Sequence, residues 1–247
     1  MKPVWEQTFI IRSYDVDPVW RLRLSSFFHF MQEVAVNHSY DLGVGYHDLE
    51  KYGMFWVLSR IKLIIKKMPS WGETINVITW PKGRNKLFAL RDFLVVNTSN
   101  EELISATSLW LLINKNNHKP LRMQSLPVNL PENDGKHALN EQLEKIRAFE
   151  HIEQSYERDV MVEDLDVNYH VNNARYIDWI LDCFDPSFLA SNNIKSIQVN
   201  YTDEAGYKDR ILVNISNDLF PENRLHYIEC VNKNTNSPVT QAVIEWA

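Results

Sequence analysis

The sequence predicts an α+β protein built from two copies of one unit, each a helix followed by an antiparallel sheet. Two observations support this fold class. In each half of the 247 residues, a helical apolar pattern is followed by four strand-like runs with turn residues between them. Residue identities also recur between the halves at a constant spacing, which is typical of an internal repeat.

The first half contains the elements of one such unit. Residues 4–12 alternate between polar and apolar side chains, as a half-buried strand does. Residues 24–38 have the spacing of an amphipathic helix with Ser25 or Ser26 as its cap, and a glycine-containing loop follows at 41–53. The apolar helix face consists of Phe27, Phe28, Met31, Val34, Ala35 and His38. Four more strands are predicted at 54–66, 73–80, 87–97 and 103–113.

A change in composition separates the two halves. Residues 114–150 are interpreted as an inter-domain linker, because Asn, Lys and Pro dominate their first part. A short amphipathic helix is expected within this linker at 137–147. The predicted domains are therefore 1–113 and 151–247. The second domain has the same plan, with a strand, a helix and four strands predicted at 155–163, 172–184, 194–202, 209–217, 224–233 and 238–246.

The repeat is visible in individual residues. Between about residues 60 and 110, an offset of 136 positions relates the two halves without a gap. The identical pairs are Ile75 with Ile211, Val77 with Val213, Asn100 with Asn236, Ala106 with Ala242, and Trp110 with Trp246. Such self-similarity predicts two copies of one domain in a single chain.

Composition and charge exclude several functional classes. The net charge of −6 argues against nucleic-acid binding, and no apolar run is long enough to span a membrane. The N-terminus has no secretory signal pattern, and the two cysteines, Cys183 and Cys230, do not suggest a disulfide framework, so a cytoplasmic protein is expected. The histidines form no metal-ligand pattern, and we predict neither a metal nor another cofactor.

A polar stretch at 164–176 is the strongest candidate for a functional site. Asp166, Asn168 and His170 alternate along it, so they would share one face if the stretch were extended. The helix start that follows could help to stabilise an oxyanion. The alternative is an ordinary loop before a helix, with Asn172 or Asn173 as the cap.

The repeat favours the catalytic interpretation. Glu204 lies after the first strand that follows the second helix, and its counterpart in the first half is Met68. The two helices align at an offset near 148. This offset places three residues without charge opposite the polar motif: Pro18, Trp20 and Leu22. A polar set confined to one half predicts one working site in the second half.

Six stretches of the chain carry the pattern of a known family. They are Ile11–Tyr14, Met31–Glu33, Pro69–Thr74, Ala106–Trp110, Asp164–Asn173 and Tyr201–Gly206. With them the chain resembles the plant-type acyl-acyl-carrier-protein (acyl-ACP) thioesterases, in their shorter bacterial form. The chloroplast targeting extension of the plant proteins is missing here, which fits a bacterial cytoplasmic enzyme.

The resemblance implies a tandem double hotdog, in which two antiparallel sheets each wrap around a central helix. It implies hydrolysis of fatty acyl-ACP, with a degenerate, substrate-lining N-terminal domain and a catalytic set of Asp166, Asn168, His170 and Glu204. Many relatives have a cysteine after the glutamate, but this chain has Ala205, so a covalent cysteine route at that position is excluded. The implied partner is an acyl carrier protein with a fatty acyl-phosphopantetheine group, and both a monomer and a homodimer are compatible.

The residues suggest a mechanism. Glu204 and His170 would hold and deprotonate a water molecule. Asn168, together with backbone N–H groups near Val171, would stabilise the oxyanion. Asp166 would orient the motif and help to set the charge state of His170.

Three other functions and one docking surface stay open. The alternatives are an acyl-CoA thioesterase of the same fold, a hotdog acyl-thioester lyase and a non-catalytic acyl-binding protein. Local basic residues could dock an acidic carrier protein or could simply be solvated strand-edge residues. These basic residues are Lys62, Lys66, Lys67, Lys82, Arg84, Lys86 and Arg175.

Overall fold

The computed structural model describes residues 1–133, 135–147, 152–217 and 224–247. The chain divides into two compact units. The first comprises residues 1–22 and 29–143, and the second comprises residues 23–28 and 144–247.

The first unit is an antiparallel sheet with one long helix. Its strands are β1 (Trp5–Ile10), β2 (Met54–Ile65), β3 (Thr74–Arg84), β4 (Phe88–Asn97), β5 (Glu102–Asn114) and the short β6 (Pro120–Leu121). Five of them are hydrogen-bonded in the order β1-β3-β4-β5-β2, and β6 pairs with β5. The helices are α2 (Tyr46–Glu50) and α1 (Leu24–Asp41), of which the part up to Phe28 is assigned to the second unit. Short 3-10 turns lie at Ser13–Asp15 and Met123–Ser125.

The second unit repeats this arrangement. Its strands are β7 (Gln154–Asp159), β8 (Ile194–Tyr201), β9 (Arg210–Asn217), β10 (Leu225–Asn232) and β11 (Ser237–Trp246). They are ordered β7-β9-β10-β11-β8, which is the order of the first sheet. The helices are α3 (Asn173–Leu181) and α4 (Pro186–Ser191), with a 3-10 turn at Val162–Asp164. The shared strand order agrees with the predicted duplication and with the α+β class.

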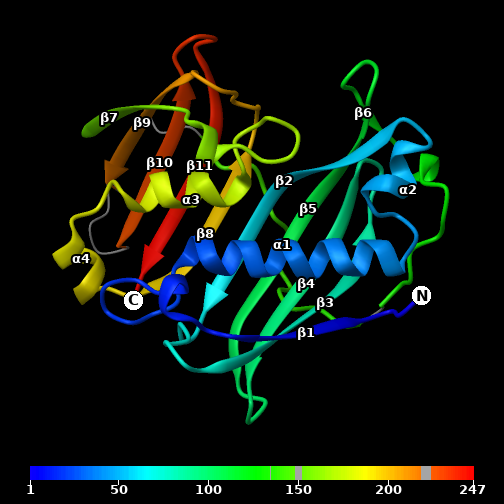
Figure 1. Ribbon diagram of the computed structural model, residues 1–247, viewed down its shortest axis with the longest axis horizontal. Coiled ribbons are helices and arrows are strands. Elements are labelled where there is room, and N and C mark those ends of the chain that lie inside the picture. The colour runs from blue at the N-terminus through cyan, green and yellow to red at the C-terminus, as the bar shows by residue number, and fades with distance from the viewer. Residues whose placement is uncertain (134, 148–151, 218–223) are drawn as a thin grey trace. The chain divides into compact units, whose positions relative to one another are not determined.

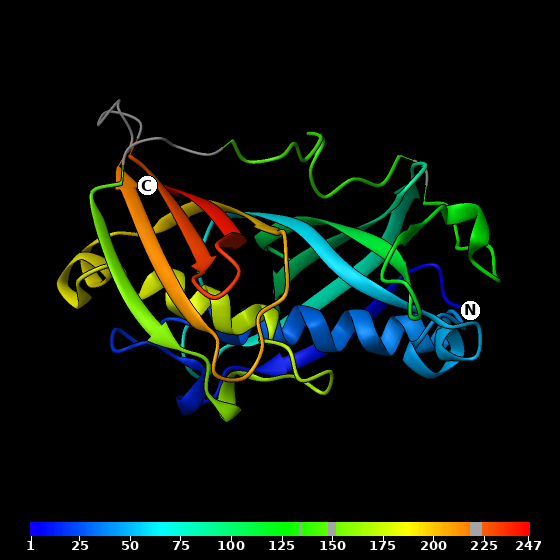
Figure 2. The same cartoon turned by 90° about the horizontal axis from the view of Figure 1, so that it is seen from above.

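The main helix of each unit buries an apolar face. All six residues of the predicted α1 face are buried, from Phe27 to His38. Phe30 of α1 stacks on Phe9 of β1 at 4.4 Å between ring centroids, and α1 lies against its sheet in Figure 1. In the second unit, α3 lies on one face of its sheet in both views (Figures 1 and 2) and buries Trp179 and Ile180 completely. The helices therefore join each sheet in one core.

Three local predictions were wrong. Helix α1 begins at Leu24, so Ser25 and Ser26 lie inside it instead of capping it. The predicted loop at 41–53 contains α2. Residues 137–147, expected as a helix, are not helical.

Side chains of the first sheet explain why the chain after residue 135 is irregular and not helical. Trp80 donates to the Lys136 carbonyl at 3.0 Å, and the buried Asp92 accepts the Ala138 N–H at 2.7 Å. Leu139 and Leu143 are buried here without forming a helix. Residues 114–143 thus pack with the first unit, while the proposed boundaries at 113 and 150 stay a prediction.

A buried histidine of α1 gives a prediction for stability. His38 is fully buried, with Nε2 at 2.9 Å from the Lys2 carbonyl and Nδ1 at 3.0 Å from Arg91 Nη1. Since Arg91 can only donate, the neutral ring with its proton on Nε2 satisfies both contacts. Burial lowers the pKa of His38 to about 4, and the nearby Arg91 charge acts in the same direction.

We therefore expect the free energy of unfolding to fall as pH falls from about 6.5 towards 4. In this window the unfolded chain binds one more proton than the folded protein, at a cost of at most about 3 kcal/mol. Urea unfolding of wild type and His38→Gln at pH 7 and pH 5 would test this. The stability advantage of the wild type should shrink at pH 5, and an unchanged difference would contradict the prediction.

Among the residues that the structure describes, none of the helices combines the length and apolar composition that crossing a membrane requires.

Candidate active site

The polar motif forms a tight loop and not the extended segment that its alternation suggested. Tyr169 adopts a left-handed conformation with φ of 64°, and its N–H donates to the Asp166 carbonyl at 3.1 Å. One oxygen of the Asp166 carboxylate accepts the N–H groups of Asn168 at 2.8 Å and His170 at 3.3 Å. Asp166 therefore holds the loop together from within, while the Asn168 side chain is exposed.

The first unit contains the same loop, which corrects the alignment of the two halves. Asp17 accepts the N–H groups of Val19 at 3.0 Å and Arg21 at 2.9 Å, and Trp20 has φ of 72°. The offset is thus 149, not the predicted 148. It places Asp17, Val19 and Arg21 opposite Asp166, Asn168 and His170.

This alignment changes which site residues lack an equivalent in the first unit. Asp166 has an equivalent acidic residue, so the prediction that all four candidates lie in one half was wrong for it. In the first unit, Arg21 forms an ion pair with Asp17 at 3.1 Å. The second unit has a histidine at that place, and the site-specific residues are Asn168, His170 and Glu204.

Backbone pairing brings Glu204 to His170. The N–H of Val171 donates to the Ala205 carbonyl at 2.9 Å, and His170 forms an isolated β-bridge with Gly206. As a result, His170 Nε2 lies 3.3 Å from Glu204 Oε2. The two side chains are 40% and 44% exposed, so water can reach both. Residues 34 positions apart in sequence thus form an acid–base pair at the surface of the second unit.

The start of α3 is capped as one of the two interpretations predicted. The Asn172 side chain accepts the Ala174 N–H at 2.9 Å. The N–H of Val171 is already bonded to Ala205, so the expected oxyanion donor at Val171 is not available. The exposed Asn168 amide stays a predicted oxyanion donor. Among the described residues, its side chain bonds to neither His170 nor Glu204.

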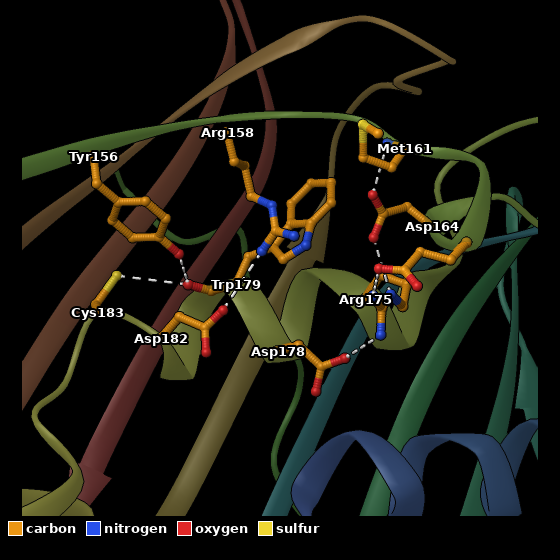
Figure 3. Close-up of polar contacts among 10 residues, drawn as sticks. Tyr156, Arg158, Met161, Asp164, Arg175, Asp178, Trp179, Asp182 and Cys183 are labelled. Atoms are coloured by element: carbon orange, nitrogen blue, oxygen red, sulfur yellow. Dashed lines mark hydrogen bonds and ion pairs between the residues drawn. The ribbon is translucent and has the colours of Figure 1, made fainter.

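A buried carboxylate supports the loop from the other side, and sequence reasoning missed it. Asp164 is only 1% exposed and accepts the Met161 N–H at 2.8 Å. Its other oxygen accepts Arg175 Nε at 3.0 Å, and Arg175 also contacts Asp178 at 3.1 Å (Figure 3). These contacts tie the motif to the first turns of α3. A carboxylate and an arginine 11 residues apart gave no periodic signal in the sequence.

The neighbouring face of α3 is held to β7. Tyr156 donates its hydroxyl to the Trp179 carbonyl, and the guanidinium of Arg158 lies 4.5 Å from the Trp179 ring centroid (Figure 3). Arg158 also reaches Asp182 at 3.5 Å. The helix that follows the motif is therefore fixed along its length.

The cysteines are not suited to nucleophilic work. Burial raises the pKa of Cys183 to about 12, and its Sγ lies 3.7 Å from the Trp179 carbonyl (Figure 3). Cys230 is fully buried, and burial raises its pKa further. Ala205 is buried beside Glu204. The geometry therefore favours water over a thiolate as the nucleophile.

In the part of the chain that the structure describes, no group of three or more His, Cys, Asp or Glu side chains is arranged to hold a metal ion. The expectation that the protein needs no cofactor stays a prediction.

The two copies of the loop allow a matched mutational test. We expect Asp166→Ala to lower any turnover at the His170–Glu204 pair by about tenfold or more, because the loop loses two hydrogen bonds that position His170. Asp166→Asn should lose less, since an amide oxygen can accept the same bonds. Asp17→Ala removes the equivalent bonds from the other copy. Steady-state kinetics should show little effect for Asp17→Ala, and equal losses in both variants would contradict this role.

Comparison with known proteins shows the class to which this arrangement belongs. A crystal structure of an acyl-ACP thioesterase from Bacteroides thetaiotaomicron aligns with a TM-score of 0.82 and 25% identity, covering 99% of this chain and 98% of that one. A 12:0-ACP thioesterase from Umbellularia californica aligns with a TM-score of 0.81 and 25% identity, covering 99% and 94%. The fold is therefore the double hotdog of thioesterases.

Sequence matches define the family. Residues 2–126 match the acyl-ACP thioesterase N-terminal domain, and residues 148–247 match the C-terminal domain. The protein belongs to the acyl-ACP thioesterase family. It is 29% identical over 233 residues to a chloroplastic palmitoyl-acyl carrier protein thioesterase of Gossypium hirsutum, which covers 86% of this chain. The chain spans about half the length of that relative, 54%.

Proposed function

We propose that this protein hydrolyses the thioester of fatty acyl-ACP and releases free fatty acid and holo-ACP. Membership of the family supports the reaction class. The relatives named above are acyl-ACP thioesterases, and their similarity covers nearly the whole of this chain. The single observation that carries the proposal is the contact of His170 with Glu204 at 3.3 Å on a solvent-accessible surface.

The geometry supports direct attack by water. Water held by the Glu204–His170 pair attacks the thioester carbon while the pair accepts its proton. The Asn168 amide donates to the oxygen that becomes negative. Asp166 keeps the His170 backbone in place. The carbon–sulfur bond then breaks, the fatty acid forms, and the proton ends on the pantetheine thiolate.

Release of thiol from a panel of acyl-ACPs would test the function. We expect free thiol and free fatty acid to appear in equal amounts, and the preferred acyl chain would be identified from the acids. The same acyl groups on CoA would test the alternative carrier. An enoyl product without free acid would contradict hydrolysis, and ligand retention without turnover would indicate an acyl-binding protein.

The cytoplasmic location and the choice between monomer and homodimer stay predictions. So does the basic docking patch, although several of its members are already paired with acidic residues. Lys62 contacts Glu141 at 2.8 Å, and Lys66 contacts Glu102 at 3.1 Å. Lys82 is 11% exposed and lies 3.4 Å from the buried Asp92. These contacts argue against a docking role for these three lysines.

A further inference from the structure

The turn that follows Glu204 occurs in both units with one informative difference. In the second unit, Asp209 N–H donates to the Gly206 carbonyl at 3.1 Å, and Lys208 N–H donates to the Val160 carbonyl at 3.0 Å. The first unit makes the same two bonds, and there the residue at the place of Lys208 is Gly72. Both residues have positive φ, 67° for Lys208 and 83° for Gly72.

Lysine is a costly residue for this turn. Glycine adopts a left-handed conformation without steric penalty, whereas a side chain with a Cβ is strained there. The first unit has the residue that suits the backbone, and the unit with the His170–Glu204 pair has one that does not. Strained backbone positions concentrate at functional sites, where the side chain is needed for its chemistry.

The ammonium group of Lys208 is free to bind an anion. Within the described ranges of the chain, Lys208 forms no ion pair with a carboxylate. Its Nζ instead lies 5.3 Å from the ring centroid of the 51%-exposed Tyr207, a cation–π distance. The other nearby cation, Arg210, contacts Asp159 at 2.9 Å. Lys208 is thus the uncommitted positive charge on the segment that carries Glu204.

The turn that carries Lys208 adjoins the His170–Glu204 pair. Gly206 pairs with His170, and Lys208 lies two residues further along the chain. Tyr169 and Tyr207 are both exposed at this edge, at 79% and 51%. A phosphopantetheine thioester carries its reacting carbon at one end and its phosphate at the other. A lysine supplies the point charge that a phosphate binds.

We propose that Lys208, supported by the ring of Tyr207, binds the phosphate of the substrate's phosphopantetheine arm. This proposal rests on the proposed thioesterase function. The carboxylates of Asp203, Glu204 and Asp209 on the same segment repel a phosphate, so the Lys208 charge determines whether the anionic arm is tolerated at this edge.

Paired substrates that differ only in the phosphate would test the proposal. The same acyl group is placed on 4′-phosphopantetheine and on pantetheine, and KM is measured for both. We expect wild type to favour the phosphorylated thioester by about fivefold, as one exposed charge pair allows. Lys208→Gln and Lys208→Gly should remove this preference without changing KM for the pantetheine ester. Lys195→Gln removes a lysine bound to Glu245 and serves as the matched control.

Lys208→Gly adds a second readout that a purely structural lysine would not give. Glycine relieves the strained turn, so we expect the melting temperature to rise by about 2 °C while phosphate discrimination is lost. Addition of salt should weaken the preference of wild type for the phosphorylated ester. In Lys208→Gln, which is expected to lack this preference, salt should not change the ratio of the two KM values.

The outcomes distinguish failure of the phosphate site from failure of the proposed thioesterase function. If wild type hydrolyses both esters with equal KM, or if Lys208→Gln keeps the preference, the phosphate site is refuted. An effect of Lys208→Gln on acyl-ACP alone would also refute it and assign the lysine to the acidic surface of the carrier protein. If wild type hydrolyses no thioester, the thioesterase function fails. Calorimetric binding of free phosphopantetheine and pantetheine would then still test Lys208.

Discussion

Replacing Glu204 with alanine is expected to lower the turnover of acyl-ACP by about 10²- to 10⁴-fold, the loss typical for a general base. Glu204 Oε2 lies 3.3 Å from His170 Nε2, and both side chains are accessible to water. Without the carboxylate, the attacking water has no anionic group to accept its proton, and His170 loses its charged neighbour. His170→Ala should cause a loss of the same order.

Because the two residues act as one unit, the double variant should be little worse than either single variant. Glu204→Gln keeps the size of the side chain but not its basicity, and we expect it to be nearly as inactive as Glu204→Ala. Glu163→Ala is the matched control, since Glu163 is an acidic residue of the same loop region that is 79% exposed and contacts Arg175 at 3.6 Å.

Stopped-flow or steady-state thiol release, together with circular dichroism to confirm folding, would measure these effects. Near-wild-type turnover in both folded single variants would refute the catalytic assignment. A large loss in Glu163→Ala would indicate that overall negative charge near the motif, and not the specific pair, controls activity.

The parts of the fold that depend on local periodicity were predictable. The apolar face of α1 follows from a 3.6-residue pattern that survives in the structure, because a long amphipathic helix on a sheet buries whichever stripe is apolar. The 136-residue offset also holds in the structure, where β3 and β9 occupy the same place in sheets of the same strand order. Periodicity and repetition are properties of the chain itself, so they require no knowledge of distant contacts.

Features set by tertiary contacts were not predictable in this way. Residues 137–147 were expected as a helix, but Trp80 and Asp92 bind the backbone of Lys136 and Ala138, and the segment is not helical. Backbone bonds of this kind satisfy the groups that a helix would otherwise pair.

The alignment of the motif with the first half could not be predicted to the exact residue either. Helix alignment gave an offset of 148, whereas the hydrogen bonds of Asp17 and Asp166 fix it at 149. A shift of one position hid the equivalence of these two residues. The proximity of His170 to Glu204 was expected from family resemblance, since their separation in sequence has no periodic meaning.

Replacing Asp164 with alanine is expected to lower the free energy of unfolding by about 3 kcal/mol, the low end for breaking a buried ion pair. Asp164 is 1% exposed, accepts the Met161 N–H and binds Arg175 Nε at 3.0 Å. Its removal takes away the acceptor of the Met161 N–H and deprives Arg175 of its most buried partner. Arg175 keeps Asp178 at 3.1 Å, which limits the loss.

The first unit again supplies the control. Asp15 is 7% exposed and accepts the Arg12 N–H at 3.0 Å, as Asp164 accepts that of Met161. Asp15→Ala should therefore cost only about 1 kcal/mol, the value of an ordinary hydrogen bond. Denaturant unfolding followed by tryptophan fluorescence would measure both changes, and equal losses would show that Arg175 adds nothing to stability.

A double variant would separate the ion pair from the buried charge that remains after one partner is removed. If the loss in Asp164→Ala comes mainly from the Arg175 charge, which then keeps only Asp178 and Glu163, adding Arg175→Met should restore part of the stability, because that charge is removed as well. Strictly additive losses would instead mean that each residue stabilises the fold through separate contacts. Asp164 would then act through the Met161 N–H alone, and the tie between the motif and α3 would be energetically unimportant.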